Sequence, residues 1–223
     1  MSRLPPIAPI PNADGPSALR HGCECCVMRG LGLCQFSIEA GLELPSQAGA
    51  PIKQFEGRVA TQRLVIRANE PLDHVPIVCE GWGAVVEYLP TGRRQILAFR
   101  LPGEFIATGL VFATSLYRDV EAVTPVLYRN FDRAALRDTL QKSPELVERV
   151  VANCIAEKER ADHLIVDLGQ RRAEQRIARL ILQIMDRMTK CGMITENTVR
   201  FPLRQIHIAD ALGMTAAYVN QIL

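Results

Sequence analysis

The amino-acid sequence predicts an α+β protein in which an N-terminal β-roll is followed by a long helix and a C-terminal helix-turn-helix domain. Three patterns carry this prediction. Between residues 50 and 131, short β-type runs alternate with turn residues about every ten residues, which is the spacing of an all-β roll. From residue 143 to 169, apolar residues recur at helical spacing. Residues 205–223 combine two short apolar helices with a glycine between them.

The composition narrows the class of protein. Hydrophobic residues make up 48% and charged residues 22% of the chain, which supports a buried core and excludes long disorder. Aromatic residues at 5% argue against a stacking platform for single-stranded nucleic acid, and the net charge of +2 neither supports nor rejects a nucleic-acid partner. No apolar run reaches the roughly 18 residues of a membrane span, and the proline-rich start has no apolar signal core. We therefore expect a cytoplasmic protein with no membrane partner.

The chain divides into four predicted segments. Residues 1–20 form a flexible arm, and residues 21–140 hold a cysteine segment and the β-roll. Residues 143–169 form the long helix, and residues 171–223 form the helix-turn-helix domain. The expected strands are residues 58–66, 76–79, 83–89, 94–100 and 120–131.

The long helix begins at a clear signal. Ser143 is a hydroxyl N-cap, Pro144 suits the first helical position, and Glu145 places an acid in the first turn. A helix that ends at Gly169 would be about 38 Å long, which is long for a compact domain. It could lie over the β-roll, but its length favours pairing with a second copy in a homodimer. The residues expected at this interface are Val147, Val150, Val151, Cys154, Ala161, Ile165 and Leu168.

Residues 205–223 have the spacing of a DNA-binding helix-turn-helix. Ala209 is the small residue needed where two helices cross, Gly213 tolerates the positive φ of a tight turn, and Thr215 is an N-cap for the second helix. An ordinary helical hairpin explains the alanine or the glycine alone, but not both at this spacing. In such a motif the second helix enters the major groove, where Asn and Gln bond to adenine and Ala packs on thymine methyls. The expected DNA-contacting residues are Arg204, Thr215, Ala216, Ala217, Tyr218, Asn220 and Gln221.

Phosphate contacts have to come largely from outside the recognition helix, because that helix carries no charged residue. Arg200, Arg204 and the arginines between 171 and 179 are the candidates. The sequence stops at Leu223, inside the predicted recognition helix. We therefore expect either a truncated sequence or a domain that lacks the rest of this surface, including the winged part.

Four of the seven cysteines fall within residues 23–34. The pattern Cys23-x2-Cys26-x7-Cys34 can place three thiolates on one metal centre, and with one remote ligand these would suit a [4Fe–4S] cluster. Cys79, at a predicted strand end, is the expected fourth ligand, with Cys25 as the alternative.

Two other interpretations explain this cysteine spacing equally well. One is zinc held by His21 and three cysteines, and the other is a segment of reduced thiols with no metal. Of the remaining cysteines, Cys154 is expected to pack in the core or the interface, and Cys191 is expected to be a free thiol.

The order of these segments resembles the CRP/FNR family of bacterial transcription regulators, from about residue 20 to the end. Residues 101–106 (Leu-Pro-Gly-Glu-Phe-Ile) look like the family's turn in the β-roll, and residues 173–178 (Ala-Glu-Gln-Arg-Ile-Ala) look like the hinge that enters its DNA-binding domain. The cysteine window is similar to that of the FNR branch. The resemblance implies a cyclic-nucleotide-binding-like sensor domain with an oxygen-labile [4Fe–4S] cluster. It also implies a homodimer that binds a palindromic operator in double-stranded DNA, works with RNA polymerase and activates anaerobic or microaerobic genes.

The sequence departs from the pattern of the FNR branch in the β-roll. The branch's β-roll cysteine would fall near Leu127, where no cysteine stands. Cys79, Cys25 or a carboxylate such as Asp119 or Glu121 would have to substitute for it.

Two more departures concern the ligands. Ala217, Asn220 and Gln221 stand where the family commonly has the Glu, Ser and Arg of an E-x-x-S-R pattern, so the operator half-site is expected to differ. Arg118-Asp119 replaces the Arg-Ser/Thr pair that holds a cyclic-nucleotide phosphate, and Asp119 would repel that anion. We therefore expect no cAMP binding.

The sequence is also consistent with two other functions. A regulator of the same family could respond to nitric oxide, to thiol oxidation or to no ligand. The β-roll could also be a binding module whose DNA-binding end is not functional. Enzymatic activity is not expected, because the sequence shows no Ser/His/Asp set, paired carboxylates or phosphate-cradling glycine loop.

Overall fold

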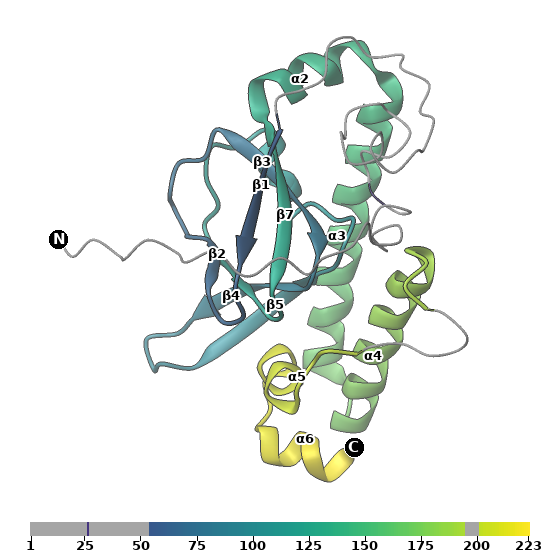
Figure 1. Cartoon of the computed structure of the whole chain (residues 1–223). Helices are drawn as coiled ribbons and strands as arrows, with labels where there is room; N and C mark the ends of the chain where they lie inside the picture. Colours follow the sequence, from purple (N-terminus) through teal and green to yellow (C-terminus); the bar gives the residue numbers. More distant parts are fainter. Residues whose placement is uncertain (1–25, 27–53, 195–200) are drawn as a thin grey trace, which may run out of the picture.

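The computed structural model of the chain describes residues 26, 54–194 and 201–223. A β-roll of two sheets lies against one side of a long helix, and the C-terminal helices gather at one end of both (Figure 1). The α+β fold predicted from the sequence, with a β-roll followed by a long helix and a helical end, is confirmed.

In the described part of the chain, every strand pair of the β-roll is antiparallel. One sheet has the order β1-β7-β3 and the other the order β2-β6-β4-β5. A short 3-10 helix, η2 (Thr108–Val111), follows the turn after β5. The strands are β1 (Gln54–Val59), β2 (Leu64–Ile66), β3 (His74–Glu80), β4 (Gly83–Tyr88), β5 (Arg94–Arg100), β6 (Asp119–Ala122) and β7 (Val126–Asp132).

Two of the predicted strands are wrong in extent. Residues 58–66 are the end of β1 and all of β2, because the chain turns between them and Gln62 takes a positive φ of 62°. Residues 120–131 are divided between β6 and β7, and the break contains Pro125, which has no backbone N–H for a strand ladder. The strand predicted at residues 94–100 is confirmed with the same bounds.

The long helix α3 (Pro144–Gln170) begins where the sequence predicted. The Ser143 side chain accepts a hydrogen bond from the backbone N–H of Leu146 at 3.3 Å, and Pro144 occupies the first helical position. A helix that was not predicted, α2 (Arg133–Lys142), precedes it and is capped by Asp132. The C-terminal helices are α4 (Ala173–Lys190), α5 (Gln205–Leu212) and α6 (Ala216–Ile222), which we call the helical unit.

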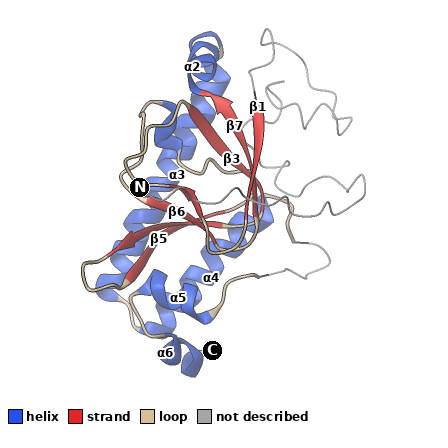
Figure 2. Cartoon of the chain, turned by 60° about the vertical axis from the view of Figure 1, so that its left-hand side comes forward, coloured by secondary structure: helices blue, strands red, loops and turns tan. Residues whose placement is uncertain are grey.

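Two hydrophobic clusters hold these elements together. The first fills the β-roll and includes residues from α2 and the first turns of α3. The second joins the four-stranded sheet, through residues such as Ile96 and Phe99, to Ile184, Ile208 and Val219 of the helical unit. Figure 2 shows α5 lying directly below β5. The helical unit is therefore packed on the β-roll rather than tethered to it.

Gly81, between β3 and β4, is a position that no other residue can occupy without movement. It has a φ of +79°, and an added Cβ would lie 1.9 Å from the carbonyl oxygen of Pro125. Gly92 has a similar φ of +77°, but a Cβ there would meet no atom within 4 Å. Replacing Gly92 would therefore add backbone strain alone, whereas replacing Gly81 would add both backbone strain and a steric clash.

We expect Gly81→Ala to lower the free energy of unfolding by more than about 3 kcal/mol, because backbone strain and a backbone clash add. Gly92→Ala is the matched control and should cost only about 1 kcal/mol. Chemical denaturation of both variants measures the difference. Equal losses would contradict the clash at Gly81.

Candidate functional site

The helices α5 and α6 form a compact helix-turn-helix. Gly213 adopts the left-handed conformation (φ 66°, ψ 34°) that ends α5, and the N–H of Met214 donates to the Ala209 carbonyl at 3.0 Å. Ala209 is 1% exposed. The Thr215 hydroxyl accepts from the N–H of Tyr218 at 3.2 Å and caps α6. The three local roles predicted for Ala209, Gly213 and Thr215 therefore match the geometry.

The predicted DNA-contacting residues lie mostly on one accessible surface. Of the seven predicted residues, six are exposed. The exception is Ala216, which packs partly against the second hydrophobic cluster. The Asn220 side chain is linked to α5, because the Gln205 side-chain amide donates a hydrogen bond to its Oδ1 at 2.5 Å. Apart from Arg204, the residues of this surface are uncharged, and two of them carry side-chain amides. The exposed residues at and near the start of α5 and along α6 are Arg204, Thr215, Ala217, Tyr218, Asn220 and Gln221.

The arginines expected to contact phosphates are partly used inside the protein. Arg171 and Arg179 both pair with the buried carboxylate of Asp167, at 2.6 and 2.9 Å, at the junction between α3 and α4. Arg176 donates to the Arg171 carbonyl at 2.7 Å. Arg200 lies outside the described residues. These contacts tie the three arginines to the junction, and the side chains of Arg171 and Arg179 stay 36% and 38% exposed.

His207 fixes the start of α5. Its Nδ1 accepts a hydrogen bond from the backbone N–H of Arg204 at 3.1 Å. Burial, and then the nearby charge of Arg204, lower the pKa of His207, which favours the neutral ring that this acceptor role needs.

The face of α3 predicted to pair with a second copy is largely uncovered in the single chain. Val147 is 41%, Val151 49% and Ile165 69% exposed, and Cys154 and Ala161 are also exposed. Leu168 is half-buried. Ile155 and Val166, which are not among the predicted interface residues, are also exposed on this helix.

Val150 is a correction to the predicted interface. It is 2% exposed and belongs to the hydrophobic cluster inside the β-roll. The first turns of α3 turn one side toward the roll, so an apolar residue on that side is already covered within the chain. Val150 therefore does not lie on the uncovered face.

Of the predicted cluster ligands, the structure describes two. Cys26 is half-buried and packs against the β-roll cluster, and Cys79 is half-buried on β3 with its Sγ 3.9 Å from the Ile77 carbonyl oxygen. Cys23, Cys25 and Cys34 lie outside the described residues. Among the residues that are described, no three His, Cys, Asp or Glu side chains are grouped so as to hold a metal ion.

The substitute ligands considered for the cluster have other partners. Asp119 accepts from the backbone N–H of Ala68 at 2.6 Å, and Glu121 pairs with Arg94 at 2.8 Å. Arg118, which precedes the Asp119 expected to repel a cyclic-nucleotide phosphate, pairs with Glu87 and lies 4.5 Å from the centre of the Tyr117 ring.

Cys191 differs from its predicted state. It is buried after the end of α4 and is disulfide-bonded, and its partner is not among the described cysteines. The prediction of a free thiol at this position is therefore wrong.

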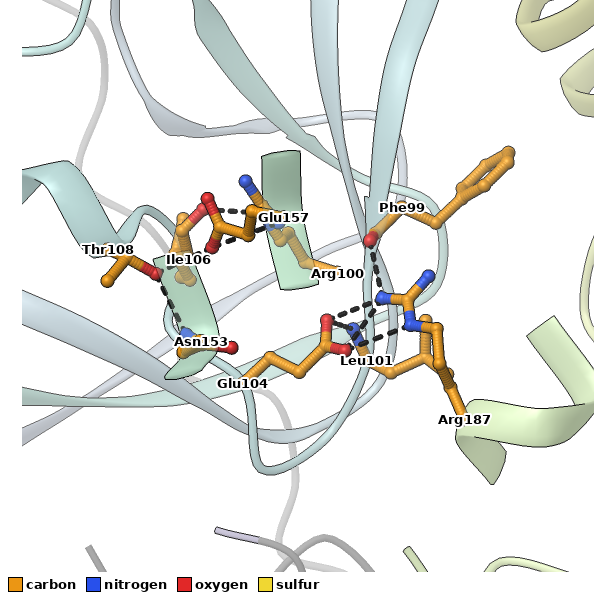
Figure 3. Close-up of polar contacts among 9 residues, drawn as sticks. All are labelled: Phe99, Arg100, Leu101, Glu104, Ile106, Thr108, Asn153, Glu157 and Arg187. Atoms are coloured by element: carbon orange, nitrogen blue, oxygen red, sulfur yellow. Dashed lines mark hydrogen bonds and ion pairs between the residues drawn. The ribbon is translucent and has the colours of Figure 1, made fainter. Parts of the chain in front are cut away.

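A network of buried charges joins the β-roll to α3. Arg100 lies 3.3 Å from Glu157 of α3 and donates to the Ile106 carbonyl at 2.8 Å. The Thr108 hydroxyl donates to Glu157 at 2.6 Å and accepts from Asn153 at 2.8 Å (Figure 3). These contacts fasten the middle of α3 to the turn that follows β5.

A second part of this network joins the β-roll to α4. Arg187 Nη2 lies 2.6 Å from Glu104 Oε2 and also donates to the Phe99 carbonyl at 2.8 Å, and Arg187 Nε donates to Glu104 Oε1 at 3.0 Å (Figure 3). The Glu104 side chain is 15% and that of Arg187 11% exposed. Burial by itself raises the pKa of Glu104, but the charges and hydrogen bonds of Arg187 and then Arg100 hold it below its ordinary value. We call this pair the interdomain ion pair.

A third contact joins the β-roll to α5. Arg94 bridges Glu121 of β6 and Asp210 of α5, with its Nη2 2.6 Å from Asp210. The side chain of the next residue, Gln95, donates to the Ala211 carbonyl at 3.0 Å.

A cavity of about 560 Å³ lies between β5, α3 and α4. Apolar residues such as Leu97, Leu164 and Leu180 line it, together with Arg100, Arg160 and Arg187.

Comparisons with known proteins identify the domain and its relatives. A family model described as a cyclic nucleotide-binding domain matches residues 56–143. The transcriptional activatory protein AadR of Rhodopseudomonas palustris is 27% identical over 220 residues, covering 95% of this chain and 87% of that protein. The transcriptional activator protein FnrL of Cereibacter sphaeroides is 28% identical over 204 residues, covering 90% and 79%. The chain is therefore similar to transcription regulators, as predicted.

Solved structures share the fold. The structure of FixK2 from Bradyrhizobium japonicum superposes with a TM-score of 0.68 at 24% identity, covering 77% of this chain and 83% of that one.

None of the helices in the described ranges is both long and apolar enough to cross a membrane.

The interdomain ion pair predicts how stability depends on pH. The pKa of Glu104 in the folded chain lies below its ordinary value, so the ionised carboxylate stabilises the fold above the unfolded-state pKa. This contribution is lost as the pH falls through the folded-state pKa. We expect Glu104→Gln to lower the free energy of unfolding by about 3 kcal/mol at neutral pH, because Arg187 loses its buried charge partner. The difference from the wild type should shrink below about pH 4.

Denaturation curves recorded over a pH series measure this effect. Glu145→Gln is the control, because its pair with Arg149 is exposed, and it should cost less than about 1 kcal/mol at any pH. A Glu104→Gln deficit that stays constant down to acid pH would show that the charge of Glu104 is not what stabilises the fold.

Proposed function

We propose, from the premise that the chain belongs to the CRP/FNR family of bacterial transcription regulators, that it binds double-stranded DNA as a homodimer and controls transcription. The observation that carries this proposal is the helix-turn-helix with an exposed face of amides on α6, docked on a cyclic nucleotide-binding domain. A palindromic operator and RNA polymerase are the proposed partners, in the cytoplasm.

Dimerisation would place two copies of α6 for reading DNA. The uncovered apolar residues of α3, among them Val151, Ile155 and Ile165, form a face that a twofold partner would bury. In dimeric helix-turn-helix proteins the recognition helices sit about 34 Å apart, one turn of DNA. A symmetric pair of α3 helices therefore supports reading of two half-sites.

The α6 surface favours reading by hydrogen bonds over charge attraction. Asn220 and Gln221 can each bond to a base edge, and Ala217 can pack on a thymine methyl. With Arg171 and Arg179 committed to Asp167, sequence-independent attraction to phosphates is limited.

We expect Asn220→Ala and Gln221→Ala each to weaken binding to the preferred duplex by about 1–3 kcal/mol, or about 5–150-fold, because a base contact is lost. Binding to a scrambled duplex should change little. Fluorescence anisotropy at fixed salt measures both affinities. Gln141→Ala, an exposed glutamine of α2, is the control. Equal losses on both duplexes would contradict base reading by these residues.

For the signal, the proposal is an N-terminal [4Fe–4S] cluster that senses oxygen and controls anaerobic or microaerobic genes. Cys23, Cys26 and Cys34 would hold it, with Cys79 or Cys25 as the fourth ligand. When bound, such a cluster supplies redox and oxygen sensitivity. Support comes from Cys26, which packs against the hydrophobic cluster of the β-roll.

A second input is favoured by the disulfide at Cys191. A cysteine bonded at the end of α4 would let thiol oxidation act directly on the first helix of the helical unit. In this alternative the regulator needs no metal.

Metal and sulfide analysis after anaerobic purification separates the two inputs. The cluster hypothesis expects a brown protein with about four irons per chain, lost on Cys23→Ser, Cys26→Ser or Cys34→Ser and kept in the Cys154→Ser control. The thiol hypothesis expects an iron-free protein whose response of DNA binding to oxidants disappears on Cys191→Ser. A colourless, iron-free anaerobic preparation would contradict the cluster.

A further inference from the structure

We propose that Glu104 and Arg187 are positioning residues for DNA reading: their interdomain ion pair fixes the helical unit on the β-roll and so sets the separation of the two recognition helices in the dimer. The proposal rests on the DNA-binding function proposed above. It assigns these two side chains, which lie far from α6, a role in operator geometry rather than in base contact.

The acceptor side of the pair is rigid. Glu104 belongs to the turn after β5, where Gly103 has a positive φ of 88° and its N–H donates to the Val78 carbonyl at 2.8 Å. The Glu104 carboxylate also accepts from the backbone N–H of Leu101 at 3.0 Å. A carboxylate held by its own turn presents both oxygens in one fixed direction to the guanidinium.

Arg187, the donor of the pair, fixes the orientation of α4. Arg187 lies in the last turn of α4, and both Nε and Nη2 reach Glu104 while Nη2 also reaches the Phe99 carbonyl. A planar guanidinium bonded in this way fixes both the distance and the rotation of the helix that carries it. The other charged pair in this part of α4, Asp186–Lys190, is exposed and lies within the helix, so it holds α4 to nothing else.

The interdomain ion pair completes a set of three anchors. Asp167 of α3 holds the first half of α4 through Arg179, Glu104 of the β-roll holds its end through Arg187, and Arg94 of the β-roll holds α5 through Asp210. Three separated anchors determine the orientation of a rigid body. The apolar contacts between the sheet and the helical unit supply adhesion but little direction.

The positive charges around Arg187 make the Glu104 carboxylate necessary to hold Arg187 at this place. Arg160 and Arg100 lie near Arg187, and burial followed by the charge of Arg187 lowers the pKa of Arg160. Without the Glu104 carboxylate, Arg187 would face these two cations in a partly buried space. Loss of Glu104 would therefore push the end of α4 away from the β-roll.

The test uses a variant that removes the pair without leaving a buried charge. Glu104→Gln combined with Arg187→Met keeps the volumes of both side chains and leaves neither charge unpaired, so the chain should fold. Lys190→Gln is the matched control, because it removes an exposed charge one helical turn away on α4. Full-length dimeric protein is used throughout.

The first measurement is the tolerance of binding to half-site spacing. An operator is selected by the wild-type protein from a randomised duplex library, and its spacer is then lengthened or shortened by one base pair. We expect the wild type and Lys190→Gln to prefer the selected spacing at least about tenfold, and the double variant to lose most of this preference. A purely structural role for the pair would lower all affinities together. An unchanged spacing preference in the double variant would overturn the proposal.

The second measurement does not involve DNA. Hydrogen exchange of the free protein reports whether the helical unit is anchored, and we expect exchange in Gln205–Leu212 to be at least about fivefold faster in the double variant than in the control. Unchanged exchange would overturn the anchoring role even if DNA binding holds. Failure of every protein to bind any duplex, with faster exchange in the double variant, would instead reject the proposed function and retain the anchor.

Discussion

The four-stranded sheet must be covered on its outer face, and the rest of the structure depends on this constraint. On β4, Val85 packs into the β-roll, whereas its neighbours Ala84 and Val86 are buried on the outer face of the sheet. Ile96 and Phe99 of β5 are buried on that outer face as well. A sheet with this face open would expose a large apolar patch. The helical unit covers it, so the helices proposed to read DNA also complete the hydrophobic core on the outside of the β-roll. The two regions are therefore bound by hydrophobic burial, not only by their covalent connection.

Hydrophobic burial explains why the helical unit stays attached, but the charged pairs explain its orientation. Apolar surfaces can slide over one another at little cost, whereas a guanidinium bonded to a carboxylate and a carbonyl accepts one geometry. The interdomain ion pair, Arg94 with Asp210, and Arg179 with Asp167 each cross from one element to another. Buried pairs of this kind contribute less to net stability than to the choice of a single arrangement. Here that arrangement fixes where α6 lies.

Local signals in the sequence were sufficient to predict the elements and some of their caps. Ser143 and Pro144 placed the start of α3, and Gly213 and Thr215 placed the turn before α6, because each acts on neighbours within a few residues. Val150 was wrong because a helical stripe shows which residues are apolar, not which surface covers them. Nor could spacing reveal the interdomain ion pair, whose members lie 83 residues apart in the chain. The cluster hypothesis stays a prediction, since three of its cysteines lie outside the described residues.

The connection between α3 and α4 is only two residues long, Arg171 and Arg172, so α4 would act as a lever about that point if its far end were released from Glu104. With 18 residues, α4 has a length of about 27 Å at about 1.5 Å per residue. A pivot of about 10° displaces the far end of such a lever by about 5 Å. The rise of DNA is about 3.4 Å per base pair. A small angular error at the pivot is thus magnified into a shift of more than one base pair, and Arg187, near the far end of the lever, stands where restraint is mechanically most effective.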